Sequence, residues 1–568
     1  MGCGSLVATH LNLLGHLVSS DGDSNSRRQA AQRYLPKMDT MDRSDELLLP
    51  DEPHSPFSAR RGSERETTKL GAFVVVLTLA AGTSSVLSGY ETAVTSAALV
   101  SIGSSLSGRA LTPLDKSLIT SSTALCALVA SPLASLLADR VGRKRVMLYA
   151  DVLFIVGSLF QASSSTVAHA IAGRCIIGMA TGLSSVAVPL YVAEMAPASH
   201  RGKLITTTIL LVTMGQVLGF MIAGLFAAWG LPEAGWRWTV ALGAVPATIQ
   251  GLMVIFLMPD SPRWLVMVGN LAAAKRVLRR IHGDDDDNIN DHGDGDGNAT
   301  GRTEILMRRI QTEARELREA RLLRQNQHSR PGSMYQWLGP WRELLDEHRH
   351  RRALAIACLL QALQQLCGFN SLMYFSTTIF MMVGFQTPRL ASLVIASINF
   401  LFTIISLRLI DKVGRRRMLL SFTPLMVLGL LSAAVGFSFL PLGALSEVPE
   451  STDGRGFAAG LVFLSIIVYV ASFALGLGNV PSMQSELYPL AVRSLGTGVA
   501  TSVSWTGNFV MGLTFLQLMS ALSPSWTFAL YAAICSIGYY LVYRLYPEMA
   551  GLGLEEAAAL LDHGWAIR

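Results

Sequence analysis

Two charged residues stand inside apolar stretches of this chain that are long enough to cross a bilayer. Glu91 lies within Gly89-Tyr90-Glu91-Thr92, and Arg174 follows Gly173 in a later stretch. A charge near the centre of a membrane helix costs about 2.5–3.5 kcal/mol on insertion scales, so such residues need an explanation. Burial favours the protonated carboxyl group, whereas a nearby cation favours the ionised one. A Glu91–Arg174 pair can therefore take up a proton from one side of a membrane and release it to the other. The alternative is a structural ion pair.

A second group of polar residues in the apolar stretches is neutral. It consists of five amides and a phenol: Gln216, Gln364, Gln365, Asn370, Tyr374 and Asn399. An amide presents a donor and an acceptor on one planar group, which matches the hydroxyl groups of an uncharged polyol or sugar. Gln365, Asn370 and Tyr374 are expected to line one side of a helix bent near Gly368. Any one of these glutamines is equally compatible with a helix–helix hydrogen bond.

A third group of charged residues recurs once in each half of the chain. Asp139-Arg140-Val141-Gly142-Arg143-Lys144-Arg145 is matched by Asp411-Lys412-Val413-Gly414-Arg415-Arg416-Arg417. Glu194 precedes Arg201 by seven residues, and Glu486 precedes Arg493 by the same distance. This repetition indicates a duplicated membrane protein with both short turns on the side that retains positive charge. Basic residues alone would fit simple anchoring, but acids at matched positions favour ion pairing.

The composition predicts the elements that must position these residues. The chain has 568 residues, of which 51% are hydrophobic and 15% charged, whereas soluble proteins carry about 25% charge. Spans of about 20 apolar residues predict an all-α membrane protein with twelve transmembrane helices in two pseudo-symmetric six-helix bundles. We expect a disordered cytoplasmic tail, a first bundle, a cytoplasmic loop with short helices and an acidic disordered insertion, a second bundle and a short cytoplasmic tail. Their respective limits are 1–66, 67–258, 259–351, 352–548 and 549–568.

Other classes of function find little support. The net charge of +6 agrees with basic cytoplasmic turns and needs no nucleic-acid partner. No cysteine pair has metal-ligand spacing, and the acidic run at 284–297 lacks the spacing of a calcium loop. The sequence therefore predicts no metal and no cofactor. With no phosphate-binding glycine loop and no nucleophile with a placed base, an enzyme is not expected.

Several motifs together resemble the sugar porters of the major facilitator superfamily, from about Gly71 to Glu556. They are Gly173-Arg174, Pro189-Leu190-Tyr191-Val192-Ala193-Glu194 with Arg201-Gly202, Pro259-Asp260-Ser261-Pro262-Arg263, and Gln364-Gln365-Leu366-Cys367-Gly368-Phe369-Asn370. Three further stretches look like the fungal-type myo-inositol/proton symporters. These are Phe369-Asn370-Ser371-Leu372-Met373-Tyr374-Phe375-Ser376, Gly478-Asn479-Val480-Pro481 with Gln484-Ser485-Glu486-Leu487-Tyr488-Pro489, and Tyr546-Pro547-Glu548-Met549-Ala550-Gly551-Leu552.

The resemblance implies a role for each group of residues. It makes Glu91 and Arg174 the proton-coupling pair, although the acid is usually aspartate. It assigns the neutral residues, with Trp505 and Asn508, to a substrate cavity between the halves. It implies a cytoplasmic gate of ion pairs: Asp139, Arg143, Glu194, Arg201, Asp411, Arg415, Glu486 and Arg493. Ser482 and Ser504 stand where the family usually has tryptophan and asparagine, which weakens the inositol assignment more than the transport assignment.

The leading hypothesis is thus a membrane transporter for myo-inositol or a related polyol or sugar, working by proton symport and alternating access. The alternatives are a facilitative hexose uniporter and a non-transporting nutrient sensor, against which the short tail after the last span argues. We expect a multi-pass protein of the plasma membrane with both termini in the cytoplasm, functional as a monomer. Its partners are then a small neutral polyol or sugar, a proton and the lipid bilayer.

Overall fold

We describe the protein from a computed structural model. It describes residues 71–197, 200–229, 235–282, 303–312, 315, 344–440, 454–483, 487–488 and 492–548. The predicted tails at 1–66 and 549–568, the acidic insertion and Glu486 lie outside these residues. So do the side chains of Asp411, Ser482 and Arg493.

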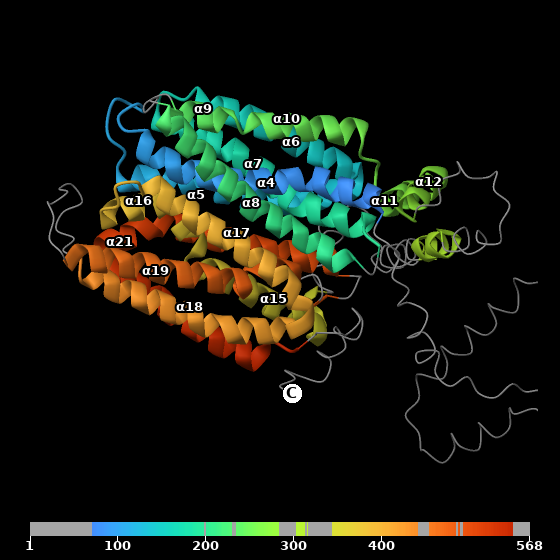
Figure 1. The fold of residues 1–568 in the computed structure, drawn as a ribbon. Helices are drawn as coiled ribbons and strands as arrows, with labels where there is room; N and C mark the ends of the chain where they lie inside the picture. Colours follow the sequence, from blue (N-terminus) through green and yellow to red (C-terminus); the bar gives the residue numbers. More distant parts are fainter. Residues whose placement is uncertain are drawn as a thin grey trace, which may run out of the picture. The chain divides into compact units, whose positions relative to one another are not determined.

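The first bundle is built from helices coloured blue to green in Figure 1, which lie side by side. They are α4 (Ala72–Ser101), α5 (Pro113–Val141), α6 (Arg143–Ala162), α7 (Val167–Met195), α8 (Arg201–Ala228), α9 (Gly235–Ala241) and α10 (Ala244–Phe256). Helices α9 and α10 together make one candidate span, Gly235–Phe256. Six spans therefore precede the middle loop, as the hydrophobic pattern predicts.

The second bundle, yellow to red in the figure, contains the remaining spans. Its elements are α15 (His348–Leu366), α16 (Phe369–Val383), α17 (Pro388–Val413), α18 (Arg415–Ser438), α19 (Gly454–Leu475), η2 (Leu477–Asn479), α20 (Val480–Met483) and α21 (Arg493–Leu545). Within the described residues, 11 helices are long and apolar enough to cross a membrane. The last of them, α21, holds two spans joined at Ser523, where φ is 71° and ψ is 156°. Counting both spans, the predicted twelve-helix all-α architecture is confirmed.

The internal repeat is visible in the backbone of the two charged turns. Gly142, between α5 and α6, has φ 96° and ψ 153°, and Gly414, between α17 and α18, has φ 97° and ψ 151°. This region of backbone conformation is essentially restricted to glycine. The matched glycines in the sequence therefore make the same tight connection in each half.

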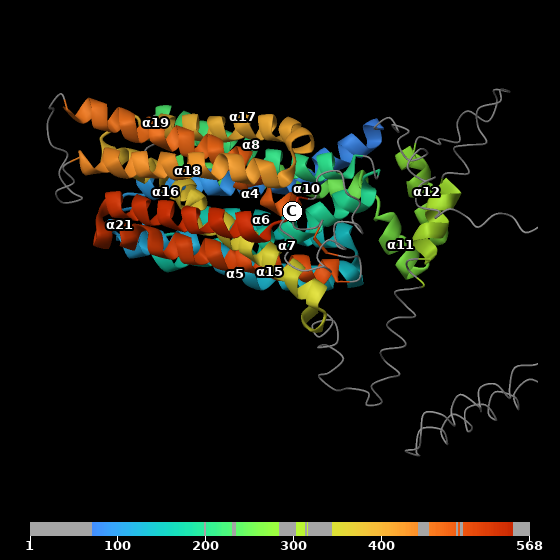
Figure 2. The same ribbon diagram turned by 90° about the horizontal axis from the view of Figure 1, so that it is seen from below.

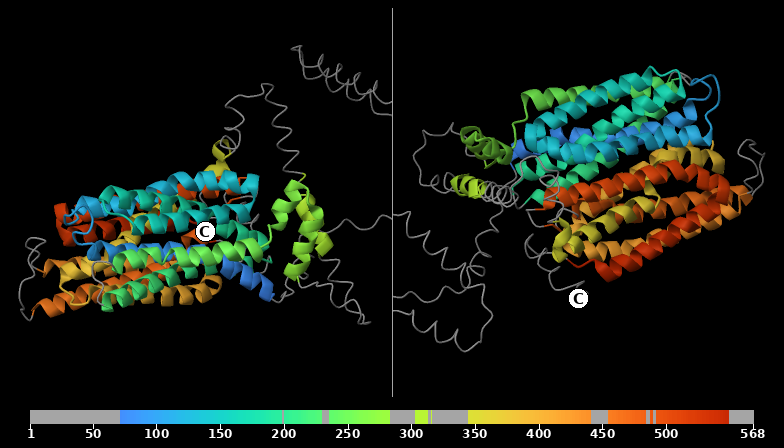
Figure 3. Two further views of the ribbon diagram at one scale, coloured as in Figure 1. Left: turned by 90° about the horizontal axis from the view of Figure 1, so that it is seen from above. Right: turned by 180° about the vertical axis from the view of Figure 1, so that it is seen from behind.

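Two further helices and a short segment pack at one end of the first bundle. Helix α11 (Pro262–Val268) and helix α12 (Leu271–His282) follow α10, and Figure 2 and Figure 3 show them beyond the beginning of α4. Trp264, Val277 and Leu278 pack in one apolar cluster with Met307 and Ile310 of the 303–312 segment. We call this the Gly71 end of the molecule and the opposite end, where α4 finishes, the Ser101 end.

The two bundles are hydrogen-bonded to each other at the Ser101 end. The Ser96 hydroxyl of α4 lies 3.1 Å from the hydroxyls of Ser376 and Thr377 on α16. Arg389 of α17 donates to the Ser101 hydroxyl over 2.7 Å. The bundles are therefore closed against each other at this end.

Candidate functional site

Glu91 and Arg174 form a buried ion pair between α4 and α7. Arg174 Nη1 donates to Glu91 Oε2 over 3.1 Å, and the two residues are 3% and 2% exposed. Arg174 Nε and Nη2 have no hydrogen-bond partner among the described residues. The guanidinium therefore has donors left for a second partner. A pair that only holds two helices together would not need these spare donors, whereas a pair whose charge state changes could use them.

The second carboxylate oxygen of Glu91 lies close to the backbone of Gly243 in the first bundle. A Cβ atom added at Gly243, which precedes α10, would lie 3.0 Å from Glu91 Oε1 and 3.2 Å from the Ser158 hydroxyl of α6. The carboxyl group and this hydroxyl thus meet where α10 begins, and a larger residue in place of Gly243 would press on both. Sequence analysis did not identify Ser158, since an isolated serine in an apolar helix carries no signal by itself.

The amides of the seventh span gather at the junction of α15 and α16. Asn370 Nδ2 donates to Gln365 Oε1 over 2.5 Å, and Gln365 Nε2 donates to the Ser504 hydroxyl of α21 over 2.9 Å. Gln364 Nε2 donates to the Leu477 carbonyl over 3.0 Å. Because Ser504 accepts a hydrogen bond from Gln365, it keeps a polar contact at the position where the family usually has an asparagine.

Gly368 produces the bend that the sequence predicts between these amides. Its φ of 90° lies in the left-handed region, and it separates Leu366 at the end of α15 from Phe369 at the start of α16. An added Cβ atom would come within 3.0 Å of the Tyr531 ring. Both the conformation and the close approach require glycine. The bend brings Asn370 back onto Gln365, which a straight helix would separate.

Tyr374 connects the charged pair to the amides. Its hydroxyl lies close to Thr92, the residue after Glu91, and to Asn508 of α21, and it interacts electrostatically with Arg174. A single side chain of the second bundle therefore contacts both groups of residues that the sequence singles out. A shift of α16 that moves Tyr374 would change the surroundings of Arg174.

Gln216 and Asn399 form a further direct contact between the two bundles. Asn399 Nδ2 of α17 donates to Gln216 Oε1 of α8 over 3.0 Å, and both residues are buried. Each amide satisfies the other in this arrangement. A polyol that entered between the bundles would replace this bond with bonds to its own hydroxyls, which amides can both donate to and accept from.

Asn508 stands on α21 one turn after Ser504 and lies close to Tyr374 of the seventh span, and Trp505 directly follows Ser504. A Cβ atom added at Gly507, which lies between Trp505 and Asn508 in the sequence, would be 2.8 Å from the Cβ atom of Gln365. The indole Nε1 of Trp505 has no hydrogen-bond partner among the described residues. A half-buried indole N–H without a partner is suited to a hydroxyl ligand.

The predicted gate is partly described. Arg143 donates to Asp139 over 3.1 Å and pairs with Glu194 at 3.0 Å, all three at the Gly71 end of the first bundle. These two ion pairs lie within one bundle. Arg201 and Arg415 also interact with other residues, while Glu486 and the side chains of Asp411 and Arg493 lie outside the described residues.

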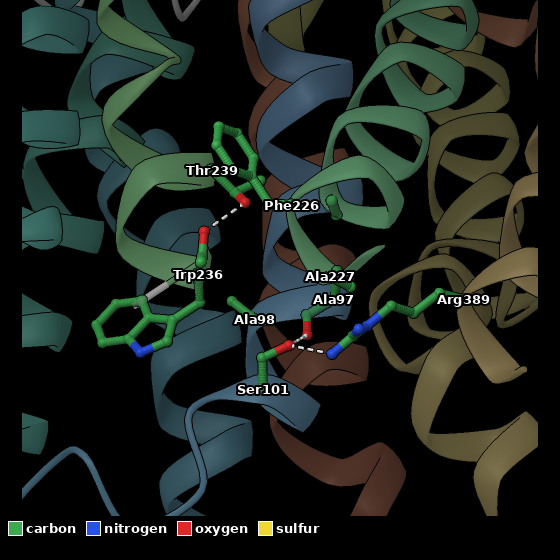
Figure 4. A pocket seen from close by; sticks show the side chains of 10 residues that line it. Ala97, Ala98, Ser101, Phe226, Ala227, Trp236, Thr239 and Arg389 are labelled. Carbon is green, nitrogen blue, oxygen red and sulfur yellow. Dashed lines mark hydrogen bonds between the residues drawn. The ribbon is translucent and has the colours of Figure 1, made fainter. Parts of the chain in front are cut away.

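A pocket at the Ser101 end lies between α4, α8, α9 and α17 (Figure 4). Ser101, Trp236, Thr239 and Arg389 line it, and it leaves about 20 Å³, roughly the space of one water molecule. None of the predicted substrate residues borders it. The small size of this pocket agrees with bundles that are closed against each other at this end.

Comparison with known proteins assigns the chain to a family. The sequence model described as "Sugar (and other) transporter" matches residues 76–561. The chain belongs to the sugar transporter family. Myo-inositol transporter 1 of Cryptococcus neoformans var. grubii is 40% identical over 500 residues, covering 88% of this chain and 83% of that protein. Myo-inositol transporter 1 of Candida albicans is 37% identical over 90% of this chain and 91% of that one.

The fold of this sugar transporter agrees with solved structures. The proton:xylose symporter XylE bound to 6-bromo-6-deoxy-D-glucose superposes with a TM-score of 0.68 at 22% identity, over 86% of this chain and 99% of that one. This similarity shows the major facilitator fold. The family match and the fold together show that the protein is a multi-pass membrane transporter and not an enzyme.

Three residues of the transporter's polar centre carry no clear sequence signal. Ser504 is a departure from the family pattern, and Thr92 and Ser158 are common residues in apolar helices. Each acquires significance only from its partner: Gln365, Tyr374 and the Glu91 carboxyl group respectively. Spacing along one helix could not have predicted these contacts, since each joins different helices.

Proposed function

We propose that this transporter carries myo-inositol, or a closely related polyol, together with a proton. The observation that carries the proposal is the link through Tyr374, which contacts both Thr92, beside the Glu91–Arg174 pair, and Asn508, beside the amides. The curated relatives at 40% and 37% identity are myo-inositol transporters. We assign proton coupling to Glu91 and Arg174.

The amide cluster supports an uncharged substrate with many hydroxyl groups. Gln365, Asn370 and Ser504 form a continuous chain of donors and acceptors, and Gln216 with Asn399 adds a second pair from the other side. We assign substrate binding to these residues with Gln364, Tyr374, Trp505 and Asn508. An uncharged polyol can exchange hydrogen bonds with every one of them and leaves no charge without a partner.

A proton gradient supplies enough free energy for accumulation. One proton moving through about 100 mV and one pH unit releases about 3.7 kcal/mol, which supports a substrate gradient of several hundredfold. Glu91 alone would be poorly solvated inside the bundle, and Arg174 stabilises its ionised form after the proton has left. The pair can therefore alternate between two states of different net charge.

We further propose that the Gly71 end faces the cytoplasm. The basic residues of both charged turns, 140–145 and 412–417, lie at this end, next to the ends of α5 and α17, as the positive-inside rule expects. Both termini are then cytoplasmic, and the plasma membrane is the proposed location. The segments 67–258 and 352–548 act as the two moving bundles of a monomer, joined by 259–351, and the ion pairs of Arg143 belong to a cytoplasmic gate.

The decisive experiment replaces Glu91 by glutamine. Glu91→Gln keeps the shape and the hydrogen bond to Arg174 but cannot release a proton. We expect uphill uptake of labelled myo-inositol into transporter-null cells to be lost, while exchange of labelled for unlabelled substrate survives. Glu304→Gln, the same change at an exposed position of the 303–312 segment, serves as the matched control.

The outcomes separate the possible functions. Accumulation by Glu91→Gln equal to that of the unchanged protein would remove Glu91 from coupling. Uptake by the unchanged protein that is insensitive to a protonophore would instead indicate a facilitative carrier. A panel of polyols and hexoses at two external pH values tests the substrate assignment independently.

A further inference from the structure

A second acid is buried in the first bundle and has no part in the site described above. Asp151 of α6 is 1% exposed. Neither of its carboxylate oxygens has a hydrogen-bond partner among the described residues. Burying an ionised carboxylate without a partner is far more costly than burying a neutral carboxylic acid. This position is therefore suited to a carboxyl group that holds a proton.

Asp151 belongs to a regular arrangement of three layers in the first bundle. Helices α4 and α6 each contribute one residue to each layer, while α10 and the preceding Gly243 contribute one residue to the upper and middle layers and two to the lower. The spacings of three or four residues repeat on one helix face. The upper layer contains Glu91, Ser158 and Gly243. The middle layer contains Leu87, Phe154 and Ala247, which pack in one fully buried apolar cluster with Ile177 and Ala180. The lower layer contains Ser84, Asp151, Gln250 and Gly251.

The lower layer is polar and contains an acceptor, the Gln250 amide oxygen, that receives no hydrogen bond from the described residues. Gln250 Nε2 donates to the Ser84 hydroxyl over 2.6 Å and to the Ala81 carbonyl over 3.3 Å, whereas Gln250 Oε1 has no partner among the described residues. A Cβ atom added at Gly251 would lie 3.9 Å from Asp151 Oδ2. A protonated Asp151 carboxyl group would add a donor to this layer, in which the Gln250 oxygen has none within the described part of the chain.

No charged side chain of the neighbouring helices serves Asp151 as a partner among the described residues. The charged groups on those helices lie in other layers. They are Glu91 on α4, Arg174 on α7, Asp115, Lys116, Asp139 and Arg140 on α5, Glu194 on α7 and Arg237 on α9, while α10 carries none. Arg143, Lys144 and Arg145, on α6 itself, stand in its first turn at the Gly71 end.

We propose that Asp151 is a second proton-binding residue of the transport cycle, on the Gly71 side of the apolar layer around Phe154. This inference rests on the proton coupling proposed above. The proton leaves the Asp151 carboxylic acid for a water molecule that enters from the Gly71 end. The carboxylate then regains a proton from the Glu91 carboxylic acid through water admitted when Phe154 moves. Only O–H bonds break and form, and one proton crosses the bundle.

Seven residues separate Glu91 from Ser84, and seven separate Ser158 from Asp151. At 1.5 Å per residue the two polar layers are about 10 Å apart along the helices. This distance is too long for direct transfer, so the apolar layer prevents a continuous proton leak. The two carboxyl groups would then communicate only during the conformational change, as coupling requires.

The test compares Asp151→Asn with the unchanged protein in proteoliposomes under an imposed pH gradient. Asparagine has the size of aspartate and cannot carry the proton. We expect the accumulation ratio of labelled myo-inositol to fall about tenfold or more, with substrate exchange in the absence of a gradient unchanged. Asp346→Asn, at an exposed position, is the matched control and should accumulate normally. Full accumulation by Asp151→Asn would overturn the proposal.

Infrared difference spectra during a pH titration provide a second measurement. The carbonyl band of a protonated carboxylic acid should persist in Glu91→Gln and lose one component in Asp151→Asn. Should Asp151→Asn fail to fold, Asp151→Glu is expected to retain accumulation with a shifted pH profile, and an unshifted profile contradicts the proposal. If the unchanged protein ignores the pH gradient, the proposed symport itself fails. If it responds and Asp151→Asn accumulates substrate as fully as the unchanged protein, the Asp151 assignment alone fails.

Discussion

The two bundles bury different kinds of polar residue, although their backbones repeat each other. Among the described residues, every buried aspartate, glutamate and arginine lies in the first bundle, and Glu91, Asp151 and Arg174 stand deep in its spans. The second bundle buries amides and hydroxyls at its centre, with Gln365 bonded to both Asn370 and Ser504. Within the described part of the chain, the first bundle thus buries charged groups as well as neutral ones such as Gln216 and Gln250, whereas the centre of the second bundle buries neutral hydrogen-bonding groups.

On the proposed function, this difference would let two unlike ligands, a proton and a polyol, share one transporter. A proton needs a group whose charge can change, and a polyol needs groups whose charge does not. Placing them in separate bundles lets each environment suit its ligand. The Tyr374 contacts and the Gln216–Asn399 bond are then the points where the two halves influence each other.

The largest expected effect comes from breaking the charged pair of the first bundle. Arg174→Met leaves the Glu91 carboxylate buried without its partner, and removal of one member of a buried pair costs about 3–5 kcal/mol. We expect a large drop in the thermal unfolding temperature of the detergent-solubilised protein, together with loss of transport.

A double variant tests whether this cost is electrostatic. Glu91→Gln combined with Arg174→Met removes both charges and should recover most of the lost stability. If the double variant is as unstable as Arg174→Met alone, the loss comes from packing around Arg174 and the comparison of the two bundles is weakened.

An intermediate effect is expected in the second bundle. Gln365→Leu leaves Asn370 and Ser504 without a partner, so substrate binding should weaken by about 1–2 kcal/mol, or roughly tenfold in KM. Sensitivity to a protonophore should remain, because the charged pair is untouched. Gln386→Leu, the same change at an exposed position, controls for altered insertion. If Gln365→Leu also lost proton coupling, proton coupling and substrate binding would not be separated between the two bundles.

The smallest effect is expected at the Gly71 end. The Asp139 side chain is 45% exposed, and its partner Arg143 also pairs with the buried Glu194. Asp139→Asn should therefore change the free energy of unfolding by less than about 1 kcal/mol. Glu194→Gln, which affects the buried partner, should have a clearly larger effect on melting temperature. Equal effects would mean that burial does not set the strength of these pairs.

Much of the architecture could be predicted from the sequence because its signals are local. Apolar stretches of membrane length, basic turns and the repeated Gly142 and Gly414 strings need no knowledge of the fold. The bend at Gly368 was also predictable, since the glycine interrupts a polar run in the seventh span. The close approach of Glu91 and Arg174 followed from the cost of leaving either charge unpaired.

The remaining features depend on contacts between helices. Asp151 stands in an apolar stretch and could have been noticed, but its significance depends on Gln250 and Gly251, which are distant in sequence. In the sequence, Ser504 suggests the loss of an amide contact, because the family usually has asparagine there. In the structure, its hydroxyl accepts a hydrogen bond from Gln365. The one-residue connection at Ser523 required the backbone itself, because serine rarely adopts a positive φ.

Gly368 divides the seventh span into two helical segments, α15 and α16, which the Asn370–Gln365 hydrogen bond joins across the bend. Because α15 and α16 each have their own helical backbone hydrogen bonds, α16 can move relative to α15, which carries Gln364 and Gln365. The Tyr469 hydroxyl donates to the Cys367 carbonyl over 2.9 Å, which satisfies a backbone group at the pivot. A swing of this kind rotates a few dihedral angles and breaks no helix, so Tyr374 can be carried toward or away from Thr92 at low energetic cost.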